Sequence, residues 1–315
     1  MSRLLTGQVI CGINNIYSVK TPEGGFSCRI KGKVLKTEKK YYNPIAVGDM
    51  VDLEADPHTP ATGWIVGRRE RRTLFSRYNK KRKASQVIAA NADLLIGIGS
   101  AASPPFRPRF LDRLLVSAAS GGLEPLLVIN KCDLGLNKDA AVRLEDYRRL
   151  GYRVLETSAL EGKGIAALEE MIVGRLAVFA GQSGVGKSTL LNLIDPELRL
   201  KVGQISQKYN RGAHTTNFAV LVRTQKGLTC IDTPGVREFE IDAISPEELP
   251  HYFPELTRLA PSCAYTSCLH RDEPGCAVLE ALKAGKIHPD RYESYLRIQD
   301  TLRQLEKEFY GRPFA

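Results

Sequence analysis

The chain has 315 residues, of which 43% are hydrophobic and 25% are charged, with 45 Lys and Arg against 35 Asp and Glu. This size and composition exclude a single small module and wholesale disorder, and they favour two or three globular domains. Because no apolar run approaches the roughly 18–20 residues that cross a bilayer, and residues 1–7 lack the apolar part of a secretory signal, we expect a cytoplasmic protein without a membrane partner.

Positive charge is concentrated in the N-terminal part of the chain. Residues 1–90 carry 17 Lys and Arg and 7 Asp and Glu, a net charge of +10, which leaves 28 residues of each sign in 91–315. Such a field favours a polyanionic partner, and nucleic acid rather than an anionic membrane, since no amphipathic basic helix accompanies it. A solvated basic face that aids solubility is the alternative.

Residues 1–72 are predicted to form a small OB-like barrel that binds RNA. Runs typical of short strands occupy 7–12, 16–19, 26–30, 50–53 and 64–66, with a turn at 21–25. Aromatic side chains that could either stack on bases or belong to the core are Tyr17, Phe26, Tyr41, Tyr42 and Trp64. The basic segments 68–72 and 77–83 are interpreted as a linker that also contacts RNA.

Residues 73–245 alternate apolar strands with helical stretches, which indicates an α/β domain with a mainly parallel sheet. We expect strands at 93–98, 125–129, 153–155, 176–180 and 228–231, and helices around 110–119, 165–173 and 189–194.

A phosphate-binding loop follows the strand at 176–180. Residues 181–188 fit G-x-x-x-x-G-K-S and lead directly into a helical run. In such a loop the backbone N–H groups surround the phosphates, Lys187 places a charge on them and the Ser188 hydroxyl ligates Mg²⁺. The predicted nucleotide contacts here are Gly181, Gln182, Ser183, Gly184, Val185, Gly186, Lys187, Ser188 and Thr189.

A second phosphate motif, Asp232-Thr233-Pro234-Gly235, lies at the end of the strand at 228–231. The Asp232 carboxylate can hold Mg²⁺ through water, and the Gly235 N–H can contact a γ-phosphate, so this segment can sense hydrolysis.

The nucleotide base is predicted from Asn130-Lys131-Cys132-Asp133, which follows the strand at 125–129. The Asp133 carboxylate can accept hydrogen bonds from the ring N–H and the amine of guanine, which adenine does not offer, so we expect GTP. Asn130 would brace the loop and Lys131 would cover the base. Ser158 and Ala159, after the next strand, match the loop whose backbone N–H contacts the guanine oxygen.

The motifs occur in an unusual order. In Ras-like GTPases the phosphate loop comes first, whereas here Asn-Lys-x-Asp and the Ser-Ala loop precede it, so the GTPase domain is predicted to be circularly permuted. Permutation is tolerated because termini lie at the surface and the sheet can be rejoined by a short loop, here around 162–164.

Residues 246–315 are predicted to form a mostly helical domain with a structural Zn²⁺ site. Three thiols and one imidazole, Cys263, Cys268, His270 and Cys276, fit a closed tetrahedral site, and a disulfide pair is the alternative. Apolar residues at near-helical spacing between 292 and 309 predict an amphipathic helix. No heptad pattern suggests a dimer, so we expect a monomer.

The barrel, the permuted order and the Cys-x4-Cys-x-His-x5-Cys spacing together resemble the ribosome small subunit-dependent GTPases, the RsgA (YjeQ) family. The resemblance implies a slow GTPase that acts late in small-subunit maturation, is stimulated by the subunit, and contacts rRNA through barrel and zinc domain. It also implies that 211–217 is a switch segment, with His214 as a catalytic residue and Thr215 or Thr216 facing Mg²⁺.

The candidate catalytic residues are therefore His214, Lys187 and Thr215, and Thr216 is a further nucleotide contact. Ras-like enzymes place a water-orienting Gln after Asp-x-x-Gly, and this chain has Val236 there, so unstimulated turnover should be slow. The alternatives are a nucleotide-regulated RNA-binding protein with incidental hydrolysis and a P-loop kinase or ATPase.

Overall fold

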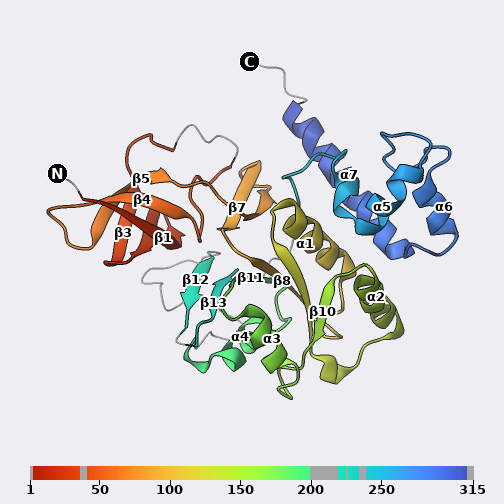
Figure 1. The fold of residues 1–315 in the computed structure, drawn as a ribbon, viewed down its shortest axis with the longest axis horizontal. Coiled ribbons are helices and arrows are strands. Elements are labelled where there is room, and N and C mark those ends of the chain that lie inside the picture. Colours follow the sequence, from red (N-terminus) through yellow and green to blue (C-terminus); the bar gives the residue numbers. More distant parts are fainter. Residues whose placement is uncertain (1–2, 36–40, 199–218, 225, 234–238, 311–315) are drawn as a thin grey trace.

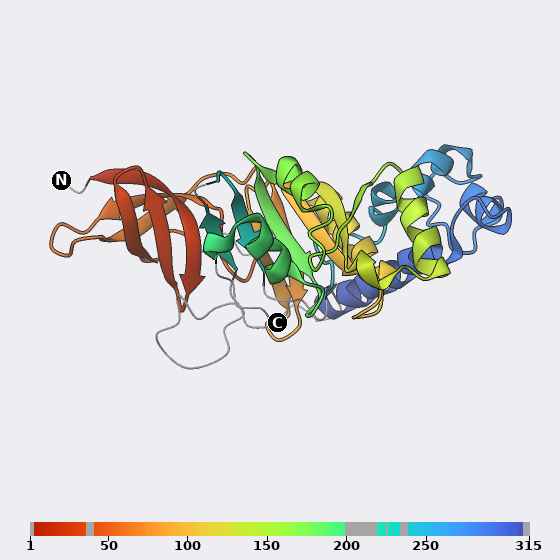
Figure 2. The ribbon, with the colours of Figure 1, turned by 90° about the horizontal axis from the view of Figure 1, so that it is seen from below.

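The computed structural model describes residues 3–35, 41–198, 219–224, 226–233 and 239–310. Along the long axis of the molecule the N-terminal barrel, the α/β sheet and the C-terminal helices follow one another (Figures 1 and 2). Among the described helices, none is both long enough and apolar enough to cross a membrane.

The predicted N-terminal barrel is confirmed. Its strands are β1 (Leu4–Ile13), β2 (Ile16–Thr21), β3 (Gly24–Ile30), β4 (Met50–Ala55) and β5 (Thr62–Arg68). They are hydrogen-bonded in the order β1-β2-β3-β5-β4, and pairing of β4 with β1 closes the barrel. Apolar residues alternate inward, as the period of a strand requires, and fill the barrel. Tyr17 is part of this core, whereas Tyr42 and Trp64 are 46% and 44% exposed.

The interpretation of the basic segments 68–72 and 77–83 as a linker was wrong for 77–83, while their contact with RNA stays a prediction. A hairpin of β6 (Leu74–Asn79) and β7 (Ala84–Ala90) forms a separate two-stranded sheet. The basic run misleads because four of its cations, at 80–83, lie in the turn between the strands, while Phe75 in β6 is fully buried and stacks on Phe239 with ring centroids 5.2 Å apart. The Tyr78 N–H also donates to the Glu240 carbonyl at 2.9 Å, so the hairpin is fixed to the α/β part.

The central sheet has the strand order β10-β9-β8-β11-β13-β12. Its strands are β8 (Leu94–Ser100), β9 (Glu124–Asn130), β10 (Arg153–Glu156), β11 (Leu176–Gly181), β12 (Val220–Arg223) and β13 (Thr229–Asp232). Neighbouring strands are parallel from β10 to β13, and β12 is antiparallel to β13. A bridge between Cys11 of β1 and Val220 of β12 joins this sheet to the barrel.

Helices cover both faces of the sheet, as its apolar strands require. On one face lie α1 (Pro108–Ser120) and α2 (Lys138–Arg149), and on the other α3 (Ile165–Ile172) and α4 (Lys187–Ile194). Neither α2 nor β12 was predicted, because α2 is mostly polar and β12 is only four residues long. Short 3-10 helices occupy Cys132–Leu134, Pro196–Leu198, Leu249–Tyr252 and Ala260–Ser262.

The C-terminal part consists of α5 (Pro254–Leu259), α6 (Ala277–Lys283) and α7 (Pro289–Tyr310). The predicted C-terminal helix is therefore confirmed. It is anchored by the fully buried Arg291, which donates to Asp112 of α1 at 2.5 Å and to Glu255 of α5 at 2.7 Å. Arg143 of α2 also donates to Asp112, at 3.0 Å. This ionic network attaches the C-terminal helices to the face of the sheet that α1 and α2 cover.

Candidate functional site: a nucleotide site and a metal centre

The phosphate loop connects the end of β11 to the start of α4, so its backbone lies at the carboxyl edge of the parallel strands, where ligands bind in open α/β sheets. Gly184 and Gly186 adopt φ angles of +82° and +97°, a region that L side chains rarely enter. A Cβ atom on Gly186 would lie 2.3 Å from the Asn130 Nδ2 atom. Glycine is therefore required here both for the turn and for the approach of the neighbouring loop.

Lys187 and Asp232 lie buried beside this loop, with 6% and 3% of their surface exposed. The Lys187 Nζ donates to the Gly181 carbonyl at 3.2 Å. Burial lowers the pKa of Lys187, although Asp232 opposes the change. Burial raises the pKa of Asp232 to about 7, against the attraction of Lys187.

Neither carboxylate oxygen of Asp232 has a hydrogen-bond partner within the described ranges. Thr233 beside it is anchored, because its hydroxyl donates to the Phe179 carbonyl at 2.7 Å. Ser188, at the start of α4, is 8% exposed. A buried carboxylate without donors is costly on its own and fits a bound cation, so this edge of the sheet suits Mg²⁺ with a phosphate ligand.

Asn130, at the end of β9, connects three loops of the site. Its Nδ2 donates to the Val185 carbonyl at 2.9 Å, and its Oδ1 accepts from the Ala159 N–H at 3.1 Å and from the Thr157 hydroxyl at 3.2 Å. The side chain is 1% exposed, so these bonds are shielded from water. The phosphate loop and the two predicted base-binding loops are thus fixed together through one amide.

The predicted base-binding side chains lie together next to Asn130. The Ser158 hydroxyl donates to the exposed Asp133 carboxylate at 2.6 Å. Lys131 has a left-handed backbone, with φ +64°, and its Nζ donates to the Ser103 carbonyl at 2.6 Å. Ser103 was not identified from the sequence, because nothing in its surroundings signals a partner for Lys131.

Four predicted residues lie outside the described residues: His214, Thr215, Thr216 and Gly235. Val236 does so too. The remaining members of the phosphate loop are described: Ser183 and Gly184 are exposed, Gln182 and Thr189 are half-buried, and Val185 is 2% exposed.

The four predicted metal ligands come together in the C-terminal part. One ligand atom from each of Cys263, Cys268, His270 and Cys276 lies within 4.8 Å of the others. The His270 Nδ1 is 3.6 Å from the Cys263 Sγ and 3.5 Å from the Cys276 Sγ. Bonds of about 2.3 Å to sulfur and 2.0–2.1 Å to nitrogen at a tetrahedral angle place the two ligand atoms about 3.6 Å apart. The cluster therefore has the spacing of a tetrahedral Cys3His site.

Neighbouring side chains support the loop that carries His270. Glu273 accepts from the N–H groups of Leu269 and Arg271 at 2.9 and 2.7 Å, and the Tyr292 hydroxyl donates to the His270 carbonyl at 2.7 Å. Burial lowers the pKa of His270 and raises that of Cys268 to about 12. A bound metal cation would lower the pKa of the thiols again, because coordination favours the thiolate form.

The fold and the site define a circularly permuted P-loop GTPase: the base-binding strand precedes the phosphate loop in the chain, and both loops meet at one edge of the sheet. The RsgA GTPase family matches residues 68–242, and the RsgA N-terminal domain matches residues 6–65. This chain belongs to the RsgA GTPase family, whose members hydrolyse GTP.

Individual relatives agree with this assignment. A protein of Borrelia recurrentis named small ribosomal subunit biogenesis GTPase RsgA is 39% identical over 98% of both chains. The protein of the same name from Flavobacterium johnsoniae is 40% identical over 99% of this chain and 98% of its own. The crystal structure of YjeQ from Thermotoga maritima matches with a TM-score of 0.71 at 32% identity, covering 99% of this chain and all of that one. YloQ, described as a circularly permuted GTPase, matches with a TM-score of 0.68 at 28% identity, over 99% of this chain and 98% of that one.

Proposed function

We propose that this protein binds the small ribosomal subunit through its rRNA and hydrolyses GTP to GDP and phosphate late in subunit maturation. The subunit stimulates hydrolysis, and hydrolysis drives release. The observation that carries the nucleotide part is the Asn130 amide, which fixes the phosphate loop and both base-binding loops at one edge of the sheet. The ribosomal part is supported by the names of the relatives and by the basic N-terminal region.

In this proposal the glycine loop binds the phosphates through its N–H groups, and Lys187 neutralises their charge without a large rearrangement, since its amine is already buried beside the loop. Ser188 and Asp232 would hold the Mg²⁺, which neutralises charge on the phosphates. Gly235 would contact the γ-phosphate. Hydrolysis would involve Lys187, His214 and Thr215, with Thr216 as a further contact in the same switch segment.

The base is selected at Asp133. Its carboxylate is exposed and already oriented by the Ser158 hydroxyl, so it can accept both N–H groups of guanine. The Ala159 N–H is held near this loop by Asn130, and the Lys131 stem would cover the base. Adenine offers no matching donor pair, so ATP should bind weakly.

The division of labour follows the predicted domains. Residues 1–72 would contact rRNA, residues 73–245 would bind and hydrolyse GTP, and residues 246–315 would hold one structural Zn²⁺ ion through Cys263, Cys268, His270 and Cys276. We propose that the protein acts as a monomer in the cytoplasm.

The binding test is sedimentation with purified small subunits at fixed salt, with the protein loaded either with GDP or with a non-hydrolysable GTP analogue. The proposal expects tighter binding in the GTP-analogue state. Lys187→Ala should remove the difference between the two states, and Lys138→Ala, which changes an exposed lysine on α2, should retain it. Equal affinity in both states would instead indicate an RNA-binding protein in which hydrolysis is incidental.

A further inference from the structure

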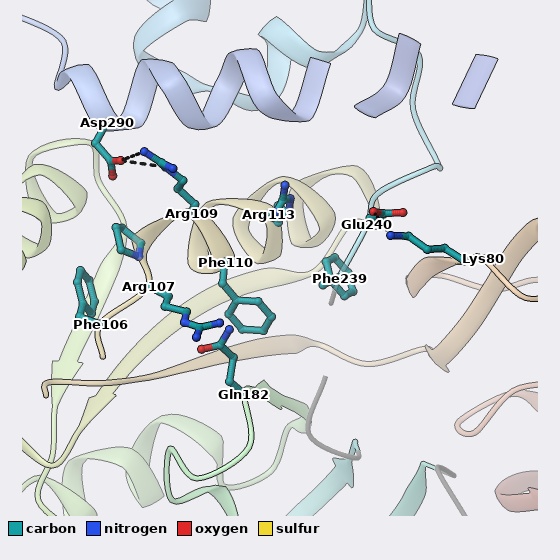
Figure 3. Close-up of a pocket in the computed structure, with 11 residues that line it drawn as sticks. Lys80, Phe106, Arg107, Arg109, Phe110, Arg113, Gln182, Phe239, Glu240 and Asp290 are labelled. Atoms are coloured by element: carbon teal, nitrogen blue, oxygen red, sulfur yellow. Dashed lines mark hydrogen bonds and ion pairs between the residues drawn. The ribbon is translucent and has the colours of Figure 1, made fainter. Parts of the chain in front are cut away.

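A cavity of about 540 Å³ lies beside the phosphate loop, and apart from Gln182 none of its lining residues has a part in the proposed chemistry. It opens between the N-terminal half of α1, the end of the β6–β7 hairpin and the chain at 239–240 (Figure 3). Gln182 of the phosphate loop forms one side of it. Its charged lining consists of four cations and two acids: Lys80, Arg107, Arg109, Arg113, Glu240 and Asp290.

Both acids of the cavity already have cationic partners. Glu240 pairs with Lys80 at 2.8 Å, and Asp290 pairs with Arg109 at 2.9 Å. The guanidinium groups of Arg107 and Arg113, in contrast, form no hydrogen bond or ion pair with any residue that the structure describes. Within the described part of the chain, the cavity therefore contains two cations without a hydrogen-bond or ion-pair partner.

The surroundings make the charge of Arg113 unfavourable without an anion, whereas Arg107 is exposed and free to contact a ligand at the cavity mouth. Arg113 is half-buried, and burial lowers its pKa although the Glu240 carboxylate opposes the change. Arg107 is the N-cap residue of α1 and Arg113 lies in its second turn, and this helix has no acidic residue in its first turn and no side-chain cap. The positive end of the helix dipole adds to the field of Arg107.

We propose that this cavity binds a ligand that carries at least two phosphate groups, with Arg107 and Arg113 contacting different phosphates. Separate contacts are required because the two guanidinium groups leave α1 on different sides: Arg107 is turned toward Gln182, and Arg113 toward α7 (Figure 3). The source is either a single-stranded RNA segment, as follows if the proposed function holds, or a free polyphosphate. In either case the ligand would lie against the phosphate loop.

The experiment uses the full chain loaded with Mg²⁺ and a non-hydrolysable GTP analogue, so that the nucleotide site is already filled. One arm titrates inorganic tripolyphosphate and follows the arginine side-chain N–H resonances by NMR. The other measures the affinity for a short single-stranded RNA across a salt series. The variants are Arg107→Gln and Arg113→Gln, and the matched control is Arg258→Gln, which removes an exposed arginine of α5.

If RNA is the ligand, log affinity falls with log salt, and each cavity variant should make this negative slope shallower by about 0.7. That amount is the contribution of one phosphate contact to a single strand. The control should keep the slope, and tripolyphosphate should compete with the RNA. If the ligand is a free polyphosphate, tripolyphosphate should shift the Arg107 and Arg113 resonances saturably, while the RNA slope stays unchanged in all variants.

No saturable shift together with no change of slope relative to Arg258→Gln would overturn the proposal. Arg107 is exposed, so its variant should fold, and Arg113→Met, which removes the charge and keeps an aliphatic stem, replaces Arg113→Gln if that variant proves unstable. Failure of the wild-type protein to bind small subunits would refute the proposed function, but it would leave the tripolyphosphate result to decide this site.

Discussion

Replacing Asp232 with asparagine should stabilise the nucleotide-free protein while it abolishes magnesium-dependent hydrolysis. Burial raises the pKa of this carboxyl from 3.8 to about 7. At about 1.4 kcal/mol for each pH unit, the ionised form costs the folded state about 4 kcal/mol at pH 8. A buried amide in the same place leaves unpartnered donors worth about 1–3 kcal/mol. The net gain in the free energy of unfolding is therefore about 1–3 kcal/mol.

The gain in unfolding free energy from Asp232→Asn should become smaller as the pH falls. Because the folded-state pKa lies above the unfolded one, the folded protein binds the proton more tightly, and its stability increases as pH falls from 8 through about 7. Asp232→Asn removes this dependence, so its advantage over the wild type should shrink between pH 8 and pH 5. Other titrating groups are the same in both proteins and cancel in the difference.

Urea unfolding in the presence of a chelator and without nucleotide measures both the gain in unfolding free energy of Asp232→Asn and its change with pH. Asp93→Asn is the control of opposite sign. Burial alone would raise the pKa of Asp93, but the Leu176 N–H and the Arg72 guanidinium outweigh it and lower the pKa, so this variant should lose stability at neutral pH. An Asp232→Asn protein that is less stable than the wild type at pH 8 would refute the reasoning.

Four further changes have defined outcomes. Gly186→Ala should weaken GDP binding by about tenfold or more in a fluorescence titration, because φ is +97° and the new Cβ would lie 2.3 Å from the Asn130 amide. Asp133→Asn should transfer preference from GTP to xanthosine triphosphate in competition assays, since the amide can donate where the carboxylate accepts. Cys276→Ser should lose bound zinc by metal analysis and lower the thermal midpoint, with GDP affinity unchanged. Arg291→Met should cost about 3–5 kcal/mol of unfolding free energy, because the buried Glu255 carboxylate loses its cation and the buried Asp112 carboxylate keeps only Arg143.

Much of the architecture could be predicted because local patterns determine it. The barrel strands alternate inward and outward residues, so a period of two indicates them before any contact is known. The phosphate loop could be located because its glycines, its lysine and its flanking strand are contiguous in the chain. The order of the motifs then indicates the permutation.

Features that depend on contacts between distant segments could not be predicted. The hairpin at 74–90 was not predicted, and its residues 77–83 were interpreted as a linker, because its burial depends on Phe239, far along the chain. The network around Arg291 joins α1, α5 and α7, and no local signal marks a charged residue on a helix as buried. Likewise, the unpartnered arginines of the cavity can be recognised only after the neighbouring acids are seen to have partners.

The central claim is that the small ribosomal subunit activates this GTPase. The most direct measurement is GTP turnover by the protein alone, with small subunits, with large subunits and with naked RNA, each across a salt series. The account predicts slow turnover alone and strong stimulation by small subunits only, declining steeply as salt increases, because phosphate contacts of the basic N-terminal region contribute to binding. Equal rates in all four mixtures would contradict it.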